Sequence, residues 1–258
     1  MIVNRVWQYH FGAGIVNTPS DFGFNGDRPS HPELLDYLAV SFIENGWSIK
    51  WLHRLILRSR AYRQSSWFNP KAHAIDSQNR LLWRMPLKRM DAETLRDSIL
   101  FATGSLNLER GGPGFFLQKK VDRVSYMHQA VDYDGPEVWR RAVYRFVVRG
   151  GERVFLDSFD CPDPAVATPQ RSATNTPVQA LTLLNNAFVF RQAELLAARI
   201  ERETAARPQA RIARAYALLF GRQPSDSEMT GGVRFLRREP LAIYCRALLN
   251  TNEFVYVP

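Results

Sequence analysis

One sequence feature constrains the fold more than any other: helix-start signals recur along the chain, each followed by an amphipathic run. A Ser, Thr or Asp that can accept a hydrogen bond from the first turn of a helix precedes five of these runs, at Ser30, Ser48, Asp91, Thr176 and Ser225. The signal at Thr176 is the strongest, because a Pro follows it directly and a Gln stands three residues later. The pattern predicts a mainly α fold with an all-helical C-terminal part, residues 176–258.

Strand signals are few and short. Residues 142–149 (AVYRFVVR) alternate and are rich in Val, Tyr and Phe, and residues 119–127 (KKVDRVSYM) could pair with them. Long irregular stretches separate the helices, and such stretches are uncommon in compact domains unless they are ordered or functional. These stretches are residues 11–30, 64–90, 104–118 and 157–175. We therefore expect an irregular multi-helix domain with long ordered loops and a small antiparallel β ribbon.

The length of 258 residues allows one large domain or two small ones. The segment NLERGGPGFF interrupts the helical pattern and marks a soft subdivision near residues 107–118. No internal repeat and no low-complexity run divides the chain further. We predict a single family domain over residues 1–258.

Charge and cysteine content narrow the class of protein. The net charge is +9, from 34 Lys plus Arg against 25 Asp plus Glu, and arginine supplies most of the positive charge. Arginine suits carboxylate, phosphate and sulfate, so an acidic partner is one interpretation and solvated helix faces are the other. The only cysteines, Cys161 and Cys245, exclude a disulfide framework and a four-cysteine zinc site. No apolar segment is long enough for a membrane span.

An ordered series of segments carries a resemblance to a known family. The series begins with NRVWQYHFGAGIVNTPSDFGFNGDRPSHPELLDYLA and ends with LLNTNEFVYV. Between them stand WLHRLILRSRAYRQSS, NRLLWRMPLKRMDAETLRDSIL and FDCPDPAVATPQRSATNTPVQALTLLNNAFV. Together they resemble a planctomycete-type domain of unknown function, the C-terminal region of large multidomain proteins that often carry cytochrome-c-like modules.

The resemblance implies a setting more than an activity. Family members are regarded as exported, so it implies a periplasmic or extracellular location, although the N-terminal residues lack a signal-peptide pattern. It also implies a partner, either an N-terminal companion domain or a separate subunit, and haem c on a separate module of family members. We expect no cofactor within this chain, because a Cys-x-x-Cys-His haem attachment sequence is missing. No reaction is attached to this region, so enzymatic activity and metal binding stay open.

The first candidate site is the loop before the second expected helix. We predict binding by Asp21, Asn25 and Arg28, with His31 as a catalytic candidate. These groups could bind a hard cation or a hydroxyl-rich substrate, whereas turn formation and helix capping are the alternative explanation. His10, where an aromatic helix end meets a loop, is a further binding candidate, and a hydrogen-bonded, partly buried histidine is its alternative.

The second candidate site is the charged segment 88–97. Glu93 is a catalytic candidate here and Arg89 a binding candidate. With Arg96 and Asp97 these residues are spaced by three or four positions and could form an ion-pair ladder on one helix face. An acid or base role for Glu93 would instead require burial that shifts its pKa.

The third candidate site is the Pro-rich segment that leads into the helix at Thr176. Asp160 and Asp163 are catalytic candidates, because carboxylates near Arg171 could form a general acid and base pair or bind a cation. Thr176 and Gln179 are binding candidates, since a helix N-terminus attracts anionic groups. The alternative is a long ordered loop in which Arg171 ties carboxylates to the core.

These observations leave several functions open. The domain could act on or bind a polysaccharide-like ligand, for which carbohydrate is the expected partner. It could also be a non-catalytic scaffolding module packed against a companion domain, which predicts an exposed apolar surface at Val3, Val6 and Trp7. Nucleic-acid binding through arginine is a further alternative, disfavoured because no nucleic-acid-binding motif is present.

Overall fold

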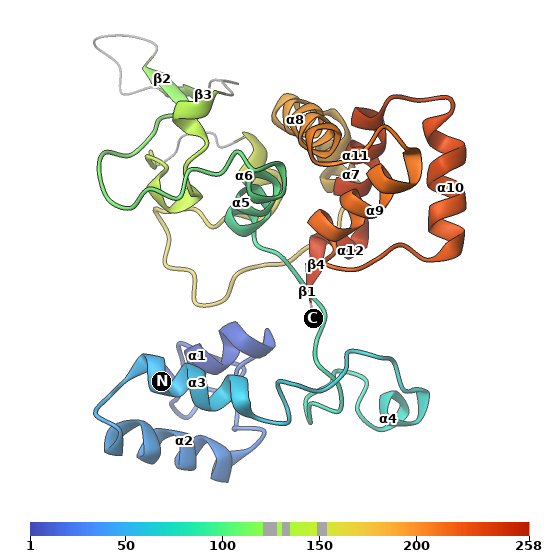
Figure 1. The fold of residues 1–258 in the computed structure, drawn as a ribbon. Coiled ribbons are helices and arrows are strands. Elements are labelled where there is room, and N and C mark those ends of the chain that lie inside the picture. The colour runs from blue at the N-terminus through green and yellow to red at the C-terminus, as the bar shows by residue number, and fades with distance from the viewer. Residues whose placement is uncertain (121–127, 131–134, 149–153, 258) are drawn as a thin grey trace. The chain divides into compact units, whose positions relative to one another are not determined.

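The computed structural model describes residues 1–120, 128–130, 135–148 and 154–257. Over these residues the chain is mainly helical, which confirms the predicted fold class (Figure 1). The chain divides into two compact units, Met1–Lys88 and Arg89–Val257. The predicted soft subdivision near 107–118 lies inside the second unit, and the single domain over 1–258 stays a prediction. None of the described helices combines the length and apolar character needed to cross a membrane.

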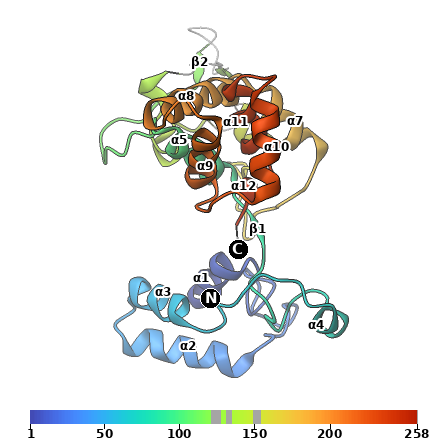
Figure 2. The same cartoon turned by 45° about the vertical axis from the view of Figure 1, so that its right-hand side comes forward.

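Four helices make up the first unit, with a short turn between the second and third and long loops at the other connections. They are α1 (Ile2–Phe11), α2 (Pro32–Glu44), α3 (Ile49–Arg58) and α4 (Pro70–Ile75). Helices α1, α2 and α3 contact one another in pairs (Figure 2). Val3, Val6 and Trp7 of α1 are buried in their shared core with Phe42 of α2 and Leu52 of α3. The exposed apolar surface predicted at these three α1 residues is therefore wrong.

The start of α2 and the end of α3 differ from the predictions. His31 is the N-cap of α2, and neither it nor Ser30 makes the predicted capping hydrogen bond. The Ser30 hydroxyl instead donates to the carbonyl of Ile15, at 3.2 Å, because the preceding loop folds back onto it. Helix α3 has the predicted Ser48 cap but ends at Arg58, where the chain turns to extended backbone.

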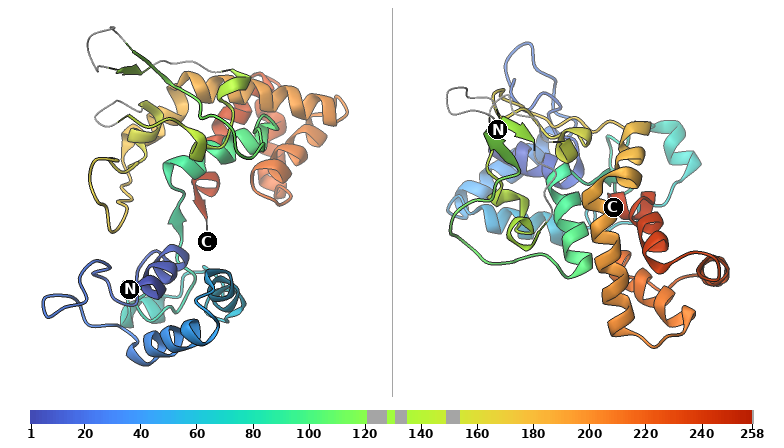
Figure 3. Two further views of the ribbon diagram at one scale, coloured as in Figure 1. Left: turned by 90° about the vertical axis from the view of Figure 1, so that its left-hand side faces the viewer. Right: turned by 90° about the horizontal axis from the view of Figure 1, so that it is seen from above.

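A short strand spans the boundary between the units, and another ends the second unit. Strand β1 (Lys88–Arg89) leads directly into α5 (Figure 3, left) and pairs with β4 (Tyr256–Val257). The helices of this unit are α5 (Ala92–Thr103), α6 (Val154–Ser158), α7 (Pro177–Asn185), α8 (Ala187–Glu203), α9 (Pro208–Leu219), α10 (Asp226–Leu236), α11 (Leu241–Leu249) and α12 (Asn252–Val255). Two single-turn 3-10 helices are also present, η1 (Pro136–Val138) and η2 (Ala142–Tyr144).

The helix signals of the second unit are confirmed. The Asp91 carboxylate accepts from the Thr94 amide at the start of α5, and Gly104 ends that helix in the left-handed conformation. Capping boxes start α7 at Thr176 and α10 at Ser225. These local signals specify helix ends because each needs only neighbouring residues.

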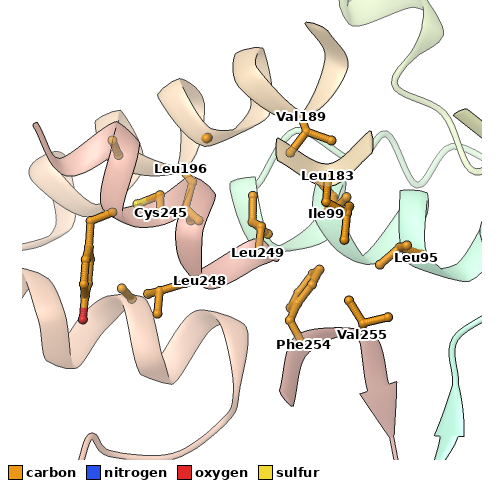
Figure 4. Packing of buried hydrophobic residues seen from close by; sticks show 14 of the residues in the cluster. Leu95, Ile99, Leu183, Val189, Leu196, Cys245, Leu248, Leu249, Phe254 and Val255 are labelled. Carbon is orange, nitrogen blue, oxygen red and sulfur yellow. The ribbon is translucent and has the colours of Figure 1, made fainter. Parts of the chain in front are cut away.

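A large apolar core holds the helices of the second unit together. Figure 4 shows Leu95 and Ile99 of α5, Leu196 of α8, Leu249 of α11 and Phe254 of α12 in one cluster. Helix α8 contacts both α5 and α11, so it lies at the centre of this packing. The core fixes the positions from which the loops of this unit leave.

The predicted β ribbon exists, but its second strand was misplaced. Strand β2 (Gln118–Lys120) pairs antiparallel with β3 (His128–Ala130), with Lys119 opposite Gln129. Residues 142–144 instead form η2, because the Asp97 carboxylate accepts from the Ala142 amide and starts a tight turn. Of the two predicted segments, residues 121–127 and 149 lie outside the described residues.

Candidate functional site

A cavity of about 320 Å³ lies within the first unit. It is enclosed by the end of α1, the loop after it, the residues just before α2, and the segment that leads to β1. Trp7 and Phe11 form an apolar wall, with their ring centroids 4.3 Å apart. The polar side chains of the lining come from Asn17, Ser30, His31, Gln78, Asn79, Arg80 and Lys88.

A buried asparagine holds the loop that follows α1. The side chain of Asn4 is fully buried, and it donates to the Val16 carbonyl at 2.9 Å and accepts from the Val16 amide at 2.8 Å. Gly14 lies against the side-chain amide of Asn4, and a Cβ at Gly14 would collide with that amide and with the Val16 carbonyl. The two contacts fix the backbone that carries Asn17 to the cavity.

Within the described residues, the His31 ring is hydrogen-bonded through Nδ1. Its Nδ1 lies 3.0 Å from the Ser30 hydroxyl, and Ser30 is tied to the Ile15 carbonyl through both its amide and its hydroxyl. The hydroxyl therefore fixes the ring orientation and leaves the Nε2 edge for other contacts. Since His31 also lines the cavity, this predicted residue is placed where it could contact a ligand.

The segment before β1 is ordered by side-chain hydrogen bonds to backbone groups. Asp76 accepts from the amides of Arg80 and Leu81, at 3.0 and 2.7 Å. Asn79 adopts the left-handed conformation and bonds both the amide and the carbonyl of Arg84. These turns place Asn79 and Arg80 at the cavity without regular secondary structure.

Lys88 joins this segment to the end of α1. Its ammonium donates to the carbonyls of Tyr9 and His10, at 2.9 and 2.6 Å, and so neutralises the negative end of that helix. Burial lowers the pKa of Lys88. The lining thus contains two cationic side chains, Arg80 and Lys88, together with an imidazole and three amide side chains, and it includes no carboxylate.

His10 does not line the cavity but pairs with a second histidine. Its Nε2 lies 2.7 Å from Nδ1 of His53 on α3, and its ring meets Tyr62 edge-on. Burial, His53 and Lys88 together lower the pKa of His10. The structure thus matches the alternative in which His10 is a hydrogen-bonded, partly buried histidine linking two helices.

The remaining predicted residues of the first unit, Asp21, Asn25 and Arg28, do not line this cavity. Asp21 accepts from the Gly23 amide in a local turn, and Asn25 and Arg28 are exposed in the same loop. Within the described residues, no three His, Cys, Asp or Glu side chains are placed to hold a metal ion. The binding role of this loop stays a prediction.

In the second unit, Asp160 is the centre of a polar network. Its carboxylate accepts from the Arg89 guanidinium at 2.6 Å and from the amide and hydroxyl of Thr174 at 2.8 and 2.9 Å. Gln179 contacts Thr174 at 3.0 Å from the first turn of α7. Burial alone would raise the pKa of Asp160, but Thr174 and Arg89 outweigh it and hold the pKa below its usual value. Asp160 also has a positive φ of 57°, a conformation that Asp tolerates better than most residues.

Glu93 belongs to a separate ion pair. Arg171 binds it with both terminal nitrogens, at 2.7 and 3.0 Å, and reaches Asp91 at 3.5 Å. Burial would raise the pKa of Glu93, yet the hydrogen bonds from Arg171 keep the pKa lowered. The predicted ion-pair ladder along α5 is not found among the described ion pairs. Arg89 lies in β1 and pairs with Asp160, Glu93 pairs with Arg171, and Arg96 lies 3.6 Å from the adjacent Asp97.

These pairs attach the loop between α6 and α7 to the core. Asp163 is exposed and accepts only a local turn hydrogen bond, from Ala165, among the interactions described. The Thr176 amide donates to the Gln179 side chain in the α7 capping box. Asp160 and Glu93 are thus ionised and engaged with arginine, which suits a structural anchor better than a general acid.

Sequence reasoning missed several cavity residues. Asn17, Asn79 and Arg80 lie in irregular segments where no spacing rule connects them to His31. The one available signal was Asn4, a polar residue on the apolar face of an amphipathic helix, which indicates a buried hydrogen bond. Its partner, 12 residues along the chain, could not be identified without the fold.

Comparisons with known proteins give one match. A family model described as PSD1, protein of unknown function (DUF1553), covers residues 1–236. No curated protein and no solved structure matches the chain. The match confirms the predicted domain of unknown function, while planctomycete origin, export and the cytochrome context stay predictions.

Proposed function

The chain belongs to the PSD1 (DUF1553) family, whose function is unknown, and we propose that its first unit binds a sugar-like ligand that carries an acidic group. The observation behind this proposal is the cavity in which His31, Arg80 and Lys88 meet amide side chains without any carboxylate. Binding is proposed, and no reaction is assigned.

The size of the cavity suits a small ligand. Small-molecule sites commonly measure roughly 300–1,000 Å³, and this one measures about 320 Å³. One sugar ring with a sulfate or carboxylate substituent fits the lower end of that range. A polysaccharide could place only one terminal or branching sugar in the cavity.

The chemistry of the lining favours hydroxyl groups and a negative charge. The side chains of Asn17 and Gln78 offer both donors and acceptors, as hydroxyl groups require, and the Asn79 amide keeps one donor and one acceptor position beyond its bonds to Arg84. Arg80 can bind a sulfate or carboxylate in bidentate fashion. The ammonium of Lys88 has three protons and uses hydrogen bonds to two carbonyls of α1.

The wall formed by Trp7 and Phe11 adds an apolar surface. Sugar rings present C–H faces that pack on aromatic rings while their hydroxyl groups contact polar side chains at the edges. Because Trp7 is largely buried in the core, this wall is rigid. A preformed wall reduces the entropy lost on binding.

Isothermal titration calorimetry with glucose 6-sulfate, glucuronic acid and glucose tests the proposal. We expect the two acidic sugars to bind more tightly than glucose, with affinity falling as salt increases. Arg80→Gln should weaken binding of the acidic sugars about tenfold, the effect of losing one charged hydrogen bond, and should leave glucose unchanged. Arg54→Gln, on the exposed face of α3, is the matched control.

The proposal fails if no acidic sugar binds at millimolar concentration. It also fails if Arg80→Gln and Arg54→Gln weaken binding equally. The affinity for acidic sugars would then depend on the overall positive charge of the protein and not on this cavity. His31→Gln keeps hydrogen-bonding groups at this position but removes the titratable ring. It therefore distinguishes a hydrogen bond from His31 to the sugar from an effect of charge on the imidazole.

A further inference from the structure

Helix α2 has a second apolar face that the core does not use. Its inner face places Leu38 and Phe42 in the core, with 2% and 3% of their surface exposed. On the outer side Tyr37, Val40 and Ile43 are 57%, 54% and 52% exposed. At 3.6 residues per turn these outer residues share an arc of roughly 120°.

Acidic residues share this arc. Glu33, Asp36 and Glu44 are exposed on the same side of α2, and the helix contains no Lys or Arg. With Tyr37, Val40 and Ile43, they form what we call the α2 outer face. A face with large apolar side chains and three carboxylates is unusual in a chain whose net charge is +9.

Helix stability does not account for this composition. Glu33 lies in the first turn, where a carboxylate complements the helix dipole, but Glu44 is the last residue of α2, where it opposes the dipole. No basic residue lies in that last turn to offset the charge of Glu44.

An exposed aromatic residue, Trp47, follows the C-terminal end of α2. It is 63% exposed and has a φ of 57°, a rare conformation for a bulky side chain. Its amide donates to the Phe42 carbonyl at 3.0 Å, and its ring contacts that of Phe42 edge-on. The contact with Phe42, on the inner side of α2, leaves most of the indole surface exposed just beyond the helix.

The charge of the face selects among the partners that could cover it. A second copy of α2 would bring carboxylates against carboxylates, and an anionic membrane or a nucleic acid would be repelled in the same way. A helix with an apolar stripe flanked by Lys or Arg would satisfy both the apolar and the acidic residues. We propose that the α2 outer face docks a cationic amphipathic helix of another protein. This role is independent of the sugar-binding cavity.

Two synthetic peptides test the proposal by fluorescence anisotropy on the full chain. Both are helical 18-residue peptides with the same leucine stripe, flanked by Lys and Arg in one and by Glu in the other. We expect the cationic peptide to bind at least tenfold more tightly than the acidic one. In the double variant Asp36→Lys with Glu44→Lys this preference should reverse.

A second double variant, Asp27→Lys with Glu239→Lys, changes the net charge equally at exposed sites outside the face and should bind like the wild type. Val40→Asp tests the apolar contribution and should weaken cationic-peptide binding at least fivefold. Circular dichroism checks that each variant is folded. Equal binding of both peptides, no binding of either, or equal loss in both double variants would overturn the proposal. Dimerisation of the full chain that Val40→Asp abolishes would also overturn it, in favour of a second copy.

Discussion

The long loops of the two units are ordered by different interactions. In the first unit, side chains such as Asn4, Asp76 and Asn79 bond directly to loop backbone. In the second unit, arginine–carboxylate pairs such as Arg89–Asp160 attach the loop to helices of the core. The first unit places its loops around a cavity, whereas the second uses its charged residues mainly for anchoring.

Their cores differ as well. The second unit buries a larger apolar cluster, contributed by α5, α8, α11 and neighbouring helices. The first unit is about half as long but contains more of the exposed large apolar side chains among the described residues. A small unit cannot bury as large a fraction of its surface. Its exposed side chains, including the α2 outer face, are therefore available to ligands and partners, and function is expected there first.

The largest effect is expected from truncating the larger core. Leu249→Ala removes a side chain with no exposed surface and should destabilise the second unit by about 2–5 kcal/mol. Leu52→Ala, equally buried in the first unit, should cost less because fewer neighbours surround it. Urea denaturation monitored by far-UV circular dichroism measures the effect of Leu249→Ala. Urea denaturation monitored by tryptophan fluorescence measures the effect of Leu52→Ala, since every tryptophan except Trp139 lies in the first unit. A larger loss for Leu52→Ala would break the comparison.

An intermediate effect is expected at the charged anchor. Asp160→Ala leaves the guanidinium of Arg89, whose side chain is 4% exposed, without its carboxylate and should cost about 3 kcal/mol. Asp160→Asn, which also tolerates a positive φ, should cost less.

The pH dependence of this anchor follows from the lowered pKa of Asp160. Its stabilisation is present above the ordinary value of 3.8 and is lost as pH falls through the lower folded value. The difference in unfolding free energy between wild type and Asp160→Asn should therefore shrink below pH 3.8. If the difference in unfolding free energy stays constant down to roughly pH 2, the negative charge of Asp160 does not hold the loop.

The smallest of these effects is expected at the neutral clamp. Asn4→Ala leaves the amide and carbonyl of Val16 without their partner and should cost about 1–3 kcal/mol, independently of pH. Asn17→Ala, exposed on the same loop, is the control and should change stability by less than about 0.5 kcal/mol. Urea denaturation monitored by tryptophan fluorescence measures both. If Asn4→Ala resembles the control, the loop is ordered by some other contact.

Local features of the fold were predictable from the sequence, and distant contacts were not. The caps at Asp91, Thr176 and Ser225 were identified correctly, because each cap bonds to residues within one helical turn. Ser30 looks like the same signal, but its hydroxyl bonds Ile15, so a tertiary contact overrode local preference. The strand expected at residues 142–149 failed similarly, because Asp97 starts a turn at Ala142.

The sequence by itself determined that this protein is mainly helical, where most of its helices begin, and which family it resembles. Only the tertiary structure decided which contacts the candidate residues make. It placed His31 and Arg80 in the lining of one cavity, paired His10 with His53, and attached Asp160 to Arg89 and Glu93 to Arg171. The physical reason is range: helix propensity and capping act within a few residues, whereas burial, ion pairing and cavity formation depend on side chains that meet only after the chain has folded.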